Sequence, residues 1–269
     1  MWEKKILMCR PDLFRIDYEI NDWMDINNRV DPGLAMEQWT RLHHLIIRCG
    51  GYVEYIESQA HVPDLVFTAN AGILKDKTFF VSSFQYHERK PEESLWAEWF
   101  LENGYAVSKM PKKMNLAFEG AGDSLEWGGY LICGYGPRSS FDAGRIAGER
   151  IGYGKIRSIK LVDSRFYHLD TCFCPLNDKL AMVYNEAFEN GFKNQPADIG
   201  ELIEVNEEDA LKFACNSVVI GEHVIMPSGC EETANKVAEH GFKVHLTDMS
   251  EFMKSGGACK CLTLELPLS

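Results

Sequence analysis

The chain has 269 residues, 45% of them hydrophobic, and a formal net charge of −12. An acidic chain without a Lys/Arg-rich block lacks the basic face that nucleic-acid binding requires, so we expect no nucleic-acid partner. No run of about 18 apolar residues occurs, so we expect no transmembrane helix. The opening MWEKKILMCRPD has no signal-peptide cleavage pattern, and we predict a cytoplasmic protein without a membrane partner.

The first recurring form is a helix that stops at glycine and leads into a strand. Its copies contain the sequences RCGGYVEY (48–55), LENGYAVSKM (101–110) and AEHGFKVHLT (238–247). Before the first of these, the apolar residues Leu42, Leu45, Ile46 and Cys49 have the spacing of one helical face. Glycine suits the end of a helix because it readily adopts the left-handed conformation.

A second form, a short apolar strand, a polar turn and another apolar strand, recurs about every fifty residues. Its copies lie at 64–84, 116–136, 166–185, 213–229 and 256–266. Strands that alternate with helices indicate an α/β fold rather than a propeller built from strands alone. We therefore predict five ββαβ repeats that close into a single domain spanning residues 1–269.

Each repeat places polar side chains just after its first predicted strand, where the repeat should bring them to one end of its axis. They are Asp64, Asn70, Glu119, Asp123, His168, Asp170, Asn216, Cys259 and Cys261. A cysteine thiolate is a nucleophile, a histidine carries protons near neutral pH, and carboxylates match the paired N–H groups of a guanidinium. The set predicts attack by a cysteine on a planar cation that carboxylates hold.

The nine cysteines do not by themselves identify the nucleophile. Their odd number and the lack of a secretory signal argue against a disulfide framework. Cys172 with Cys174, and Cys259 with Cys261, form C-x-C pairs that do not match the usual spacing of zinc ligands. Cys259 and Cys261 would share one face of a strand, so periodicity leaves both open.

Three motifs, taken in order, resemble those of the guanidino-group-modifying enzymes of the pentein fold. They are FEGAGD (118–123), HLD (168–170) and the terminal GG-x-x-x-C (256–261). This family includes arginine deiminase, dimethylarginine dimethylaminohydrolase, agmatine deiminase and arginine–glycine amidinotransferase. The resemblance covers nearly the whole chain, and it implies an α/β propeller of five blades, the pentein fold.

The resemblance implies a catalytic role for Cys261, His168 and Glu119. Cys261 rather than Cys259 matches the nucleophile, and His168 matches the general acid and base. Glu119, together with the substrate-binding residue Asp170, matches the carboxylates that bind the guanidinium. It implies no metal or organic cofactor, because side chains supply both the nucleophile and the proton carrier. The implied partner is a small guanidino compound, and a homo-oligomer is compatible with the sequence.

The resemblance also implies a substrate pocket. Asn21 and Asp64 match pocket positions, and Arg89 and Arg138 match residues that bind the substrate α-carboxylate, where the alternative is a solvated surface arginine. Deiminases usually carry an aspartate in the motif F-T-x-D, whereas FTANAG places Asn70 there. An uncharged amide can still donate and accept hydrogen bonds, and it tolerates a neutral ureido group better than a carboxylate does.

This departure makes the chain most similar to the arginine dihydrolase branch, which converts arginine into ornithine, carbon dioxide and ammonia. The alternatives are a deiminase or dimethylarginine hydrolase that stops at citrulline, an amidinotransferase, and a non-catalytic binding protein on the same fold. The extra Ala121 in FEGAGD leaves the position of Asp123 undecided.

Overall fold

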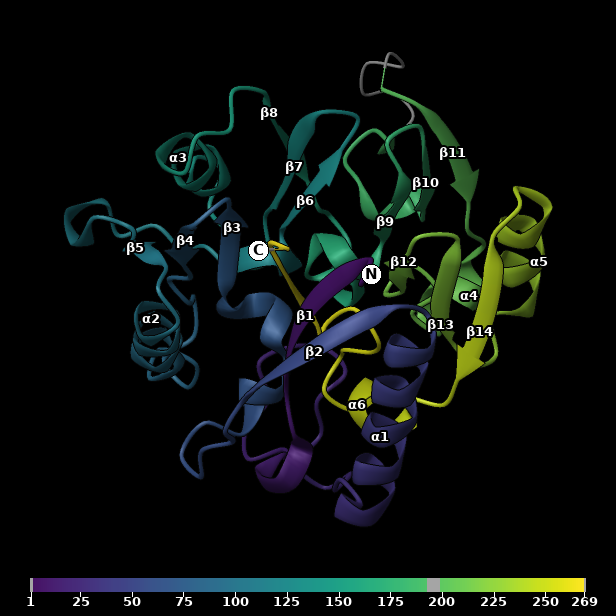
Figure 1. Cartoon of the computed structure of the whole chain (residues 1–269), viewed down its shortest axis with the longest axis horizontal. Coiled ribbons are helices and arrows are strands. Elements are labelled where there is room, and N and C mark those ends of the chain that lie inside the picture. The colour runs from purple at the N-terminus through teal and green to yellow at the C-terminus, as the bar shows by residue number, and fades with distance from the viewer. Residues whose placement is uncertain (1, 193–198, 269) are drawn as a thin grey trace.

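The computed structural model describes residues 2–192 and 199–268. Over these residues the strands form five three-stranded sheets, which Figure 1 shows arranged around a common centre. This arrangement confirms the predicted α/β propeller. The strands are β1 (Lys4–Cys9), β2 (Gly51–Ile56), β3 (Gly72–Lys75), β4 (Thr78–Val81), β5 (Ala106–Ser108), β6 (Ser124–Trp127), β7 (Tyr130–Tyr135), β8 (Ile156–Lys160), β9 (Phe173–Asn177), β10 (Leu180–Val183), β11 (Glu201–Glu204), β12 (Val218–Ile220), β13 (His223–Pro227), β14 (Lys243–Thr247) and β15 (Leu264–Leu266).

The sheets share one connection pattern, an antiparallel pair of strands followed by a parallel third strand. In the sheet of β3, β4 and β5, Gly72 pairs with Val81 in the antiparallel pair, and Thr78 pairs with Ala106 in the parallel pair. The helix that connects the second strand to the third lies on the outside (Figure 1). Helices in this position are α1 (Pro32–Arg48), α2 (Glu92–Glu102), α3 (Ala143–Arg150) and α5 (Glu231–Glu239).

In the sheet of β9, β10 and β11, the connection that should carry the helix of the predicted ββαβ order is only partly described. Between β10 and β11, the residues that the structure describes include the 3-10 turn Asn185–Ala187 and no α-helix. Residues 193–198 of this connection lie outside the described part of the chain. Two short helices, α4 (Glu207–Leu211) and α6 (Ser250–Met253), lie in connections between sheets.

The prediction of a strand, a turn and a second strand within 256–266 is wrong. Residues 256–263 form turns and only β15 is a strand, whose antiparallel partner is β1 from the beginning of the chain. Because β1 also pairs in parallel with β2, one sheet joins the two ends of the described chain. The ring of sheets is closed in this way. Cys259 and Cys261 consequently lie in a turn, and the argument that they share a strand face does not apply.

Helix α1 shows how the sequence determines these elements. Its N-cap is Asp31, whose carboxylate accepts hydrogen bonds from the N–H groups of Gly33 and Leu34. Such a cap contributes about 1 kcal/mol. Leu42 and Ile46 are buried on the predicted apolar face, and the helix ends before Gly50, which has a φ of 96°. No helix of the described residues has the length and apolar character needed to cross a bilayer.

The polar residues of each repeat lie before the first strand of a sheet, not after it as predicted. They occupy turns, including the 3-10 turns Thr68–Ala71, Gly120–Gly122 and Leu169–Thr171, which precede β3, β6 and β9. The segment 64–71 is buried along its whole length. Its apolar residues therefore indicate burial on every side rather than one face of a strand, and this is why the strand was predicted too early.

Candidate active site

Cys261 is buried and is held by a network centred on Asn216. The side-chain oxygen of Asn216 accepts hydrogen bonds from the N–H groups of Ala258 and Cys261, at 3.0 and 3.1 Å. Its amide nitrogen donates to the Cys261 sulfur at 3.1 Å and to the carbonyl of Asp170 at 3.0 Å. The Cys261 thiol in turn donates to the Asp170 carboxylate at 3.5 Å. Asn216 thus fixes both the backbone and the sulfur of Cys261.

Burial dominates the acid–base state of this thiol. It raises the pKa of Cys261 well above its ordinary value, the nearby Asp170 carboxylate raises that pKa further, and the Asn216 hydrogen bond opposes both. Burial also raises the pKa of Asp170 to about 7, against the charge of Lys260. The thiol of Cys261 is therefore protonated at neutral pH, and a cation in the adjoining cavity would favour its thiolate.

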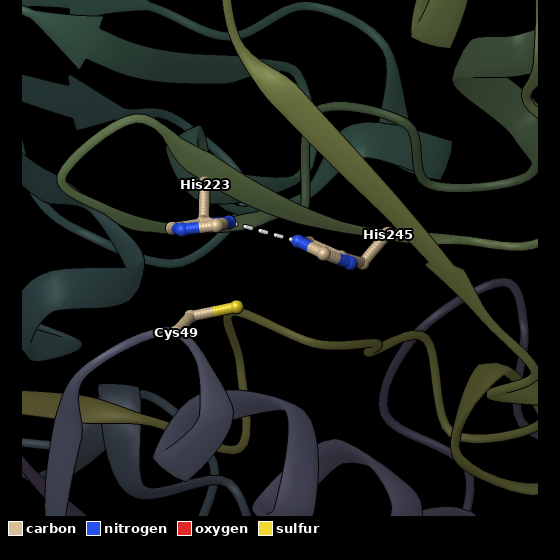
Figure 2. Close-up of side chains that lie close together, drawn as sticks. All are labelled: Cys49, His223 and His245. Carbon is tan, nitrogen blue, oxygen red and sulfur yellow. Dashed lines mark hydrogen bonds between the residues drawn. The ribbon is translucent and has the colours of Figure 1, made fainter.

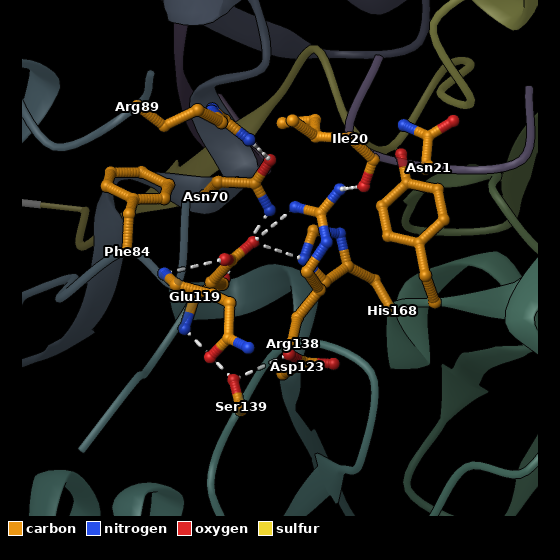
Figure 3. A network of polar contacts seen from close by, with 12 residues as sticks. Ile20, Asn21, Asn70, Phe84, Arg89, Glu119, Asp123, Arg138, Ser139 and His168 are labelled. Carbon is orange, nitrogen blue, oxygen red and sulfur yellow. Dashed lines mark hydrogen bonds and ion pairs between the residues drawn. The ribbon is translucent and has the colours of Figure 1, made fainter. Parts of the chain in front are cut away.

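Glu119 and His168 form the second part of the site (Figure 3). One oxygen of the fully buried Glu119 accepts from His168 Nε2 at 2.8 Å and from the guanidinium of Arg138 at 2.9 Å. Burial alone would raise the pKa of Glu119, but the charge of Arg138 and the bond to His168 hold it well below its usual range. Asp123 supports this part by accepting from Ser139 Oγ at 2.6 Å and from the N–H of Leu169 at 3.1 Å.

Arg89 is a buried residue, not a solvated surface arginine. Its guanidinium forms two bonds with Glu92, at 2.7 and 2.9 Å, and donates to the side-chain oxygen of Asn70 at 2.8 Å. Asn70 therefore turns its amide nitrogen towards the carbonyl of Glu119, 3.4 Å away. Asp64 accepts from the hydroxyl of Tyr18 at 3.0 Å, and burial raises its pKa despite the charge of Arg89.

The loop before α1 covers the site. Asn21 accepts hydrogen bonds from the N–H groups of Trp23 and Met24 and donates to the carbonyl of Ser255 at 3.0 Å. The carbonyl of Ile20 accepts from Arg138 at 2.9 Å. The cavity beneath the loop has a volume of about 10 Å³, which is room for about one water molecule. A ligand the size of an amino acid would therefore have to move this loop.

Six of the sequence-predicted site residues line this cavity: Asn21, Asp64, Asn70, Arg89, Arg138 and Cys261. Glu119, His168 and Asp170 do not line it; Glu119 bonds Arg138 and His168, and Asp170 bonds the Cys261 thiol. Arg138 connects the two parts of the site, because it lines the cavity with Cys261 and also bonds Glu119. Its guanidinium lies over the ring of Tyr167, 4.6 Å from the ring centre, and Asn70 and Tyr167 line the same cavity. The cavity is lined by Ile20, Asn21, Met24, Asp64, Phe67, Asn70, Arg89, Arg138, Tyr167, Ser255 and Cys261.

Two carboxylate oxygens of the site find no hydrogen-bond donor within the described residues. They are Oδ1 of Asp64, which lines the cavity, and Oδ1 of Asp170, which belongs to the carboxylate beside the Cys261 sulfur. Buried polar atoms are nearly always paired, so each such atom needs an explanation. Acceptors without donors suit a ligand that brings several N–H groups.

Sequence reasoning missed several residues that hold the site together. Asn216 was among the polar residues at the repeated position, but nothing else in the sequence indicated that it holds Cys261 in place. Nothing in the sequence indicated Glu92 or Tyr18, because each lies in a segment without a recognised motif. A larger cavity, of about 690 Å³, lies elsewhere among β3, β6, β9, β12 and β15. None of the three predicted catalytic residues lines it.

Comparison with known proteins identifies close relatives. The family model for eukaryotic N,N dimethylarginine dimethylhydrolase matches residues 10–268. The bifunctional arginine dihydrolase/ornithine cyclodeaminase ArgZ of Synechocystis sp. is 41% identical over 97% of the chain, which spans 37% of the length of that relative. The N(G),N(G)-dimethylarginine dimethylaminohydrolase of Mycobacterium tuberculosis is 35% identical, over 98% of this chain and 86% of its own. A crystal structure of the N-terminal domain of ArgZ, an Asn-to-Ser mutant covalently bound to a reaction intermediate, has 39% identity, a TM-score of 0.92 and 98% coverage of both chains.

Proposed function

The chain belongs to the N,N-dimethylarginine dimethylhydrolase family, and on that basis we propose that it hydrolyses the guanidinium group of arginine through a covalent intermediate on Cys261. The observation that carries this proposal is the pairing of Glu119 with a guanidinium. The side chain of Arg138 already presents that group to Glu119 at 2.9 Å, over the rings of Tyr86 and Tyr167. The site is thus built to hold the chemical group on which the enzyme acts.

The substrate guanidinium takes the place of Arg138 at Glu119 and donates to the carboxylate of Asp170. A guanidinium offers five N–H donors, which satisfies the oxygen of Asp170 that otherwise has no partner. The displaced Arg138 is then available for the α-carboxylate of the substrate. Arg89 holds Asn70 in place, and Asn21 fastens the covering loop. Arg89 was expected at the substrate α-carboxylate, but its guanidinium bonds Glu92 and Asn70, so in this proposal it positions Asn70 instead.

The reaction begins at the thiol. The bound cation lowers the pKa of Cys261, its proton passes to His168, and the sulfur bonds to the central guanidinium carbon. His168 returns the proton to the departing amino group, and the C–N bond breaks to release ammonia. Water then gives a proton to His168 and bonds to the carbon. The C–S bond breaks, the thiol is restored, and citrulline and a proton remain.

Retention of citrulline would permit a second round, in which water converts its ureido group into carbon dioxide and ammonia and leaves ornithine. In this proposal Asn70 decides whether citrulline is released or hydrolysed further to ornithine. Its amide carries no charge and therefore tolerates the neutral ureido group of citrulline. We expect Asn70→Asp to shift the product from ornithine towards citrulline, as measured by separating both products after incubation with arginine. Asn115→Asp, on an exposed turn, is the matched control. An unchanged ornithine yield would remove Asn70 from the argument.

A second candidate function is hydrolysis of dimethylarginine to citrulline, which the family match and the relative from Mycobacterium tuberculosis favour. Incubation with arginine, dimethylarginine, agmatine and citrulline, scored for ammonia, citrulline and ornithine, separates the two functions. A haloacetamidine reagent that fails to label Cys261 would instead favour a binding protein. We also propose that residues 1–269 form one domain, which the pairing of β15 with β1 supports. A cytoplasmic location stays a prediction.

A further inference from the structure

A second group of reactive side chains lies outside the candidate active site. Cys49 follows α1, His223 begins β13 and His245 lies in β14 (Figure 2). Their ligand atoms all lie within 4.8 Å of one another, and His223 Nδ1 and His245 Nε2 are 2.9 Å apart. Across residues 2–192 and 199–268, no other three histidine, cysteine or acidic side chains meet so closely.

The fold holds these three side chains in place. His223 pairs with Lys243, and Ile225 pairs with His245, in the parallel ladder of β13 and β14. Because side chains alternate across a strand, His223 and Ile225 point to the same face of β13. His245 lies opposite Ile225 and therefore points to that face too. Cys49 caps α1, its N–H donating to the carbonyl of Leu45 at 2.9 Å. Figure 2 shows its sulfur pointing towards both rings.

The protonation of the two histidines suits metal binding. A hydrogen bond between two imidazole nitrogens needs one ring to accept, so at least one ring is neutral. The neutral imidazole is the form that binds metals, and a metal ion would displace the proton of the Cys49 thiol.

We propose that Cys49, His223 and His245 form a binding site for zinc or a similar transition-metal ion, with water as the fourth ligand. One sulfur and two imidazole nitrogens are the donors such ions prefer, whereas magnesium and calcium prefer oxygen. Tetrahedral zinc places two nitrogens about 3.3 Å apart and sulfur and nitrogen about 3.5 Å apart. The two rings would separate by a few tenths of an ångström, and the sulfur would approach by about 1.3 Å at most.

The thiolate offsets part of the repulsion between the metal ion and the cationic side chains of Arg48 and Lys243. The ion would join the end of α1 to β13 and β14. None of the three residues lines the cavity beside Cys261. We therefore expect the metal to raise thermal stability, and the Cys49→Ser variant to keep the activity of the unaltered protein.

The test uses the full chain, freed of metal with a chelator and then titrated with Co²⁺ and Zn²⁺. We expect one equivalent of Co²⁺ to give the thiolate-to-cobalt absorption band, and one equivalent of Zn²⁺ to raise the melting temperature. Cys49→Ser should abolish the band. His223→Asn and His245→Asn should weaken binding by more than the roughly 10–100-fold that loss of an outer-shell partner causes.

Controls separate this site from the other thiols. Cys261→Ser and the buried Cys230→Ser should keep the cobalt band, and the surface variant His240→Asn should bind zinc normally. Equal melting temperatures in chelator show that a variant is folded. If one variant is unfolded, the remaining two ligand variants decide the outcome. A band that survives Cys49→Ser but disappears in Cys261→Ser overturns the proposal, and so does binding without a defined stoichiometry.

Discussion

Replacement of Asn216 by alanine tests whether this residue activates Cys261. The substitution removes the acceptor for two buried N–H groups, those of Ala258 and Cys261. Each buried donor left without a partner costs about 1–3 kcal/mol, so for two donors we expect the free energy of unfolding to fall by about 2–6 kcal/mol. This loss should be visible as a lower midpoint in urea denaturation.

The same substitution removes the hydrogen bond that opposes the raised pKa of Cys261. A hydrogen bond to a charged group contributes about 1.5–3 kcal/mol. The pKa of Cys261 should therefore rise further in Asn216→Ala. Alkylation of the thiol at fixed pH should slow by about 10–100-fold, because only the thiolate reacts.

The assay is the rate of alkylation of Cys261 by iodoacetamide between pH 6 and 10, with the modified residue identified by peptide mass. Ser217→Ala is the matched control. Its buried hydroxyl donates one hydrogen bond, to the carbonyl of Ala214 at 2.7 Å, and does not touch Cys261. It should lower stability without moving the pH profile. Superimposable profiles for Asn216→Ala and the unaltered protein would refute the proposed activation.

Three further predictions concern the groups around Cys261. Arg138→Ala should raise KM for arginine at least tenfold, a loss of about 1.4 kcal/mol in binding, but leave KM for agmatine, which has no α-carboxylate, nearly unchanged; equal effects on the two substrates would contradict a role for Arg138 at the carboxylate. Gly122→Ala should abolish activity, because the added Cβ would lie 2.4 Å from Asn70 Nδ2 and 3.3 Å from the His168 ring. Its control, Gly154→Ala, meets no atom within 4 Å and should be fully active. The pKa of Asp170 is raised to about 7 in the folded chain by burial, so the folded state binds the proton more tightly than the unfolded state, and stability should fall as pH rises from about 4 to about 7. Asp170→Asn should therefore be more stable relative to the unaltered protein at pH 8 than at pH 5, by about 3 kcal/mol; a constant difference in thermal or urea unfolding would show that Asp170 titrates normally.

The repeat and the motifs were enough to predict the propeller and six of the residues that line the cavity. His168 carries chemistry at a repeated position, whereas the choice of Cys261 over Cys259 needed the family resemblance. The hydrogen bonds and ion pairs between site residues could not be predicted, because they join residues far apart in the sequence and no local pattern encodes them. Arg138 is the clearest case: its sequence context, GPRSS, does not distinguish a surface arginine from one that is buried on Glu119.

The partner of β15 was equally hidden from local reasoning. The segment 256–266 contains only enough alternating apolar and polar residues for one strand. The pairing of that strand with β1 joins parts of the chain more than 250 residues apart. Asn216 shows a different limit. A buried asparagine commonly satisfies backbone groups, and only the structure reveals that the backbone it satisfies belongs to the proposed nucleophile.

A buried thiol with a raised pKa is a poor nucleophile, yet this state is consistent with the proposed chemistry. Without a ligand, Glu119 is paired with Arg138, and no cation among the described residues hydrogen-bonds Asp170. A second guanidinium would add one positive charge beside Asp170 and Cys261, where burial disfavours both ionised groups and the Asp170 carboxylate further disfavours the Cys261 thiolate. That charge favours ionisation of both groups. Activation of Cys261 is thus coupled to occupancy of the site, and the same coupling limits reaction of the empty site with other electrophiles.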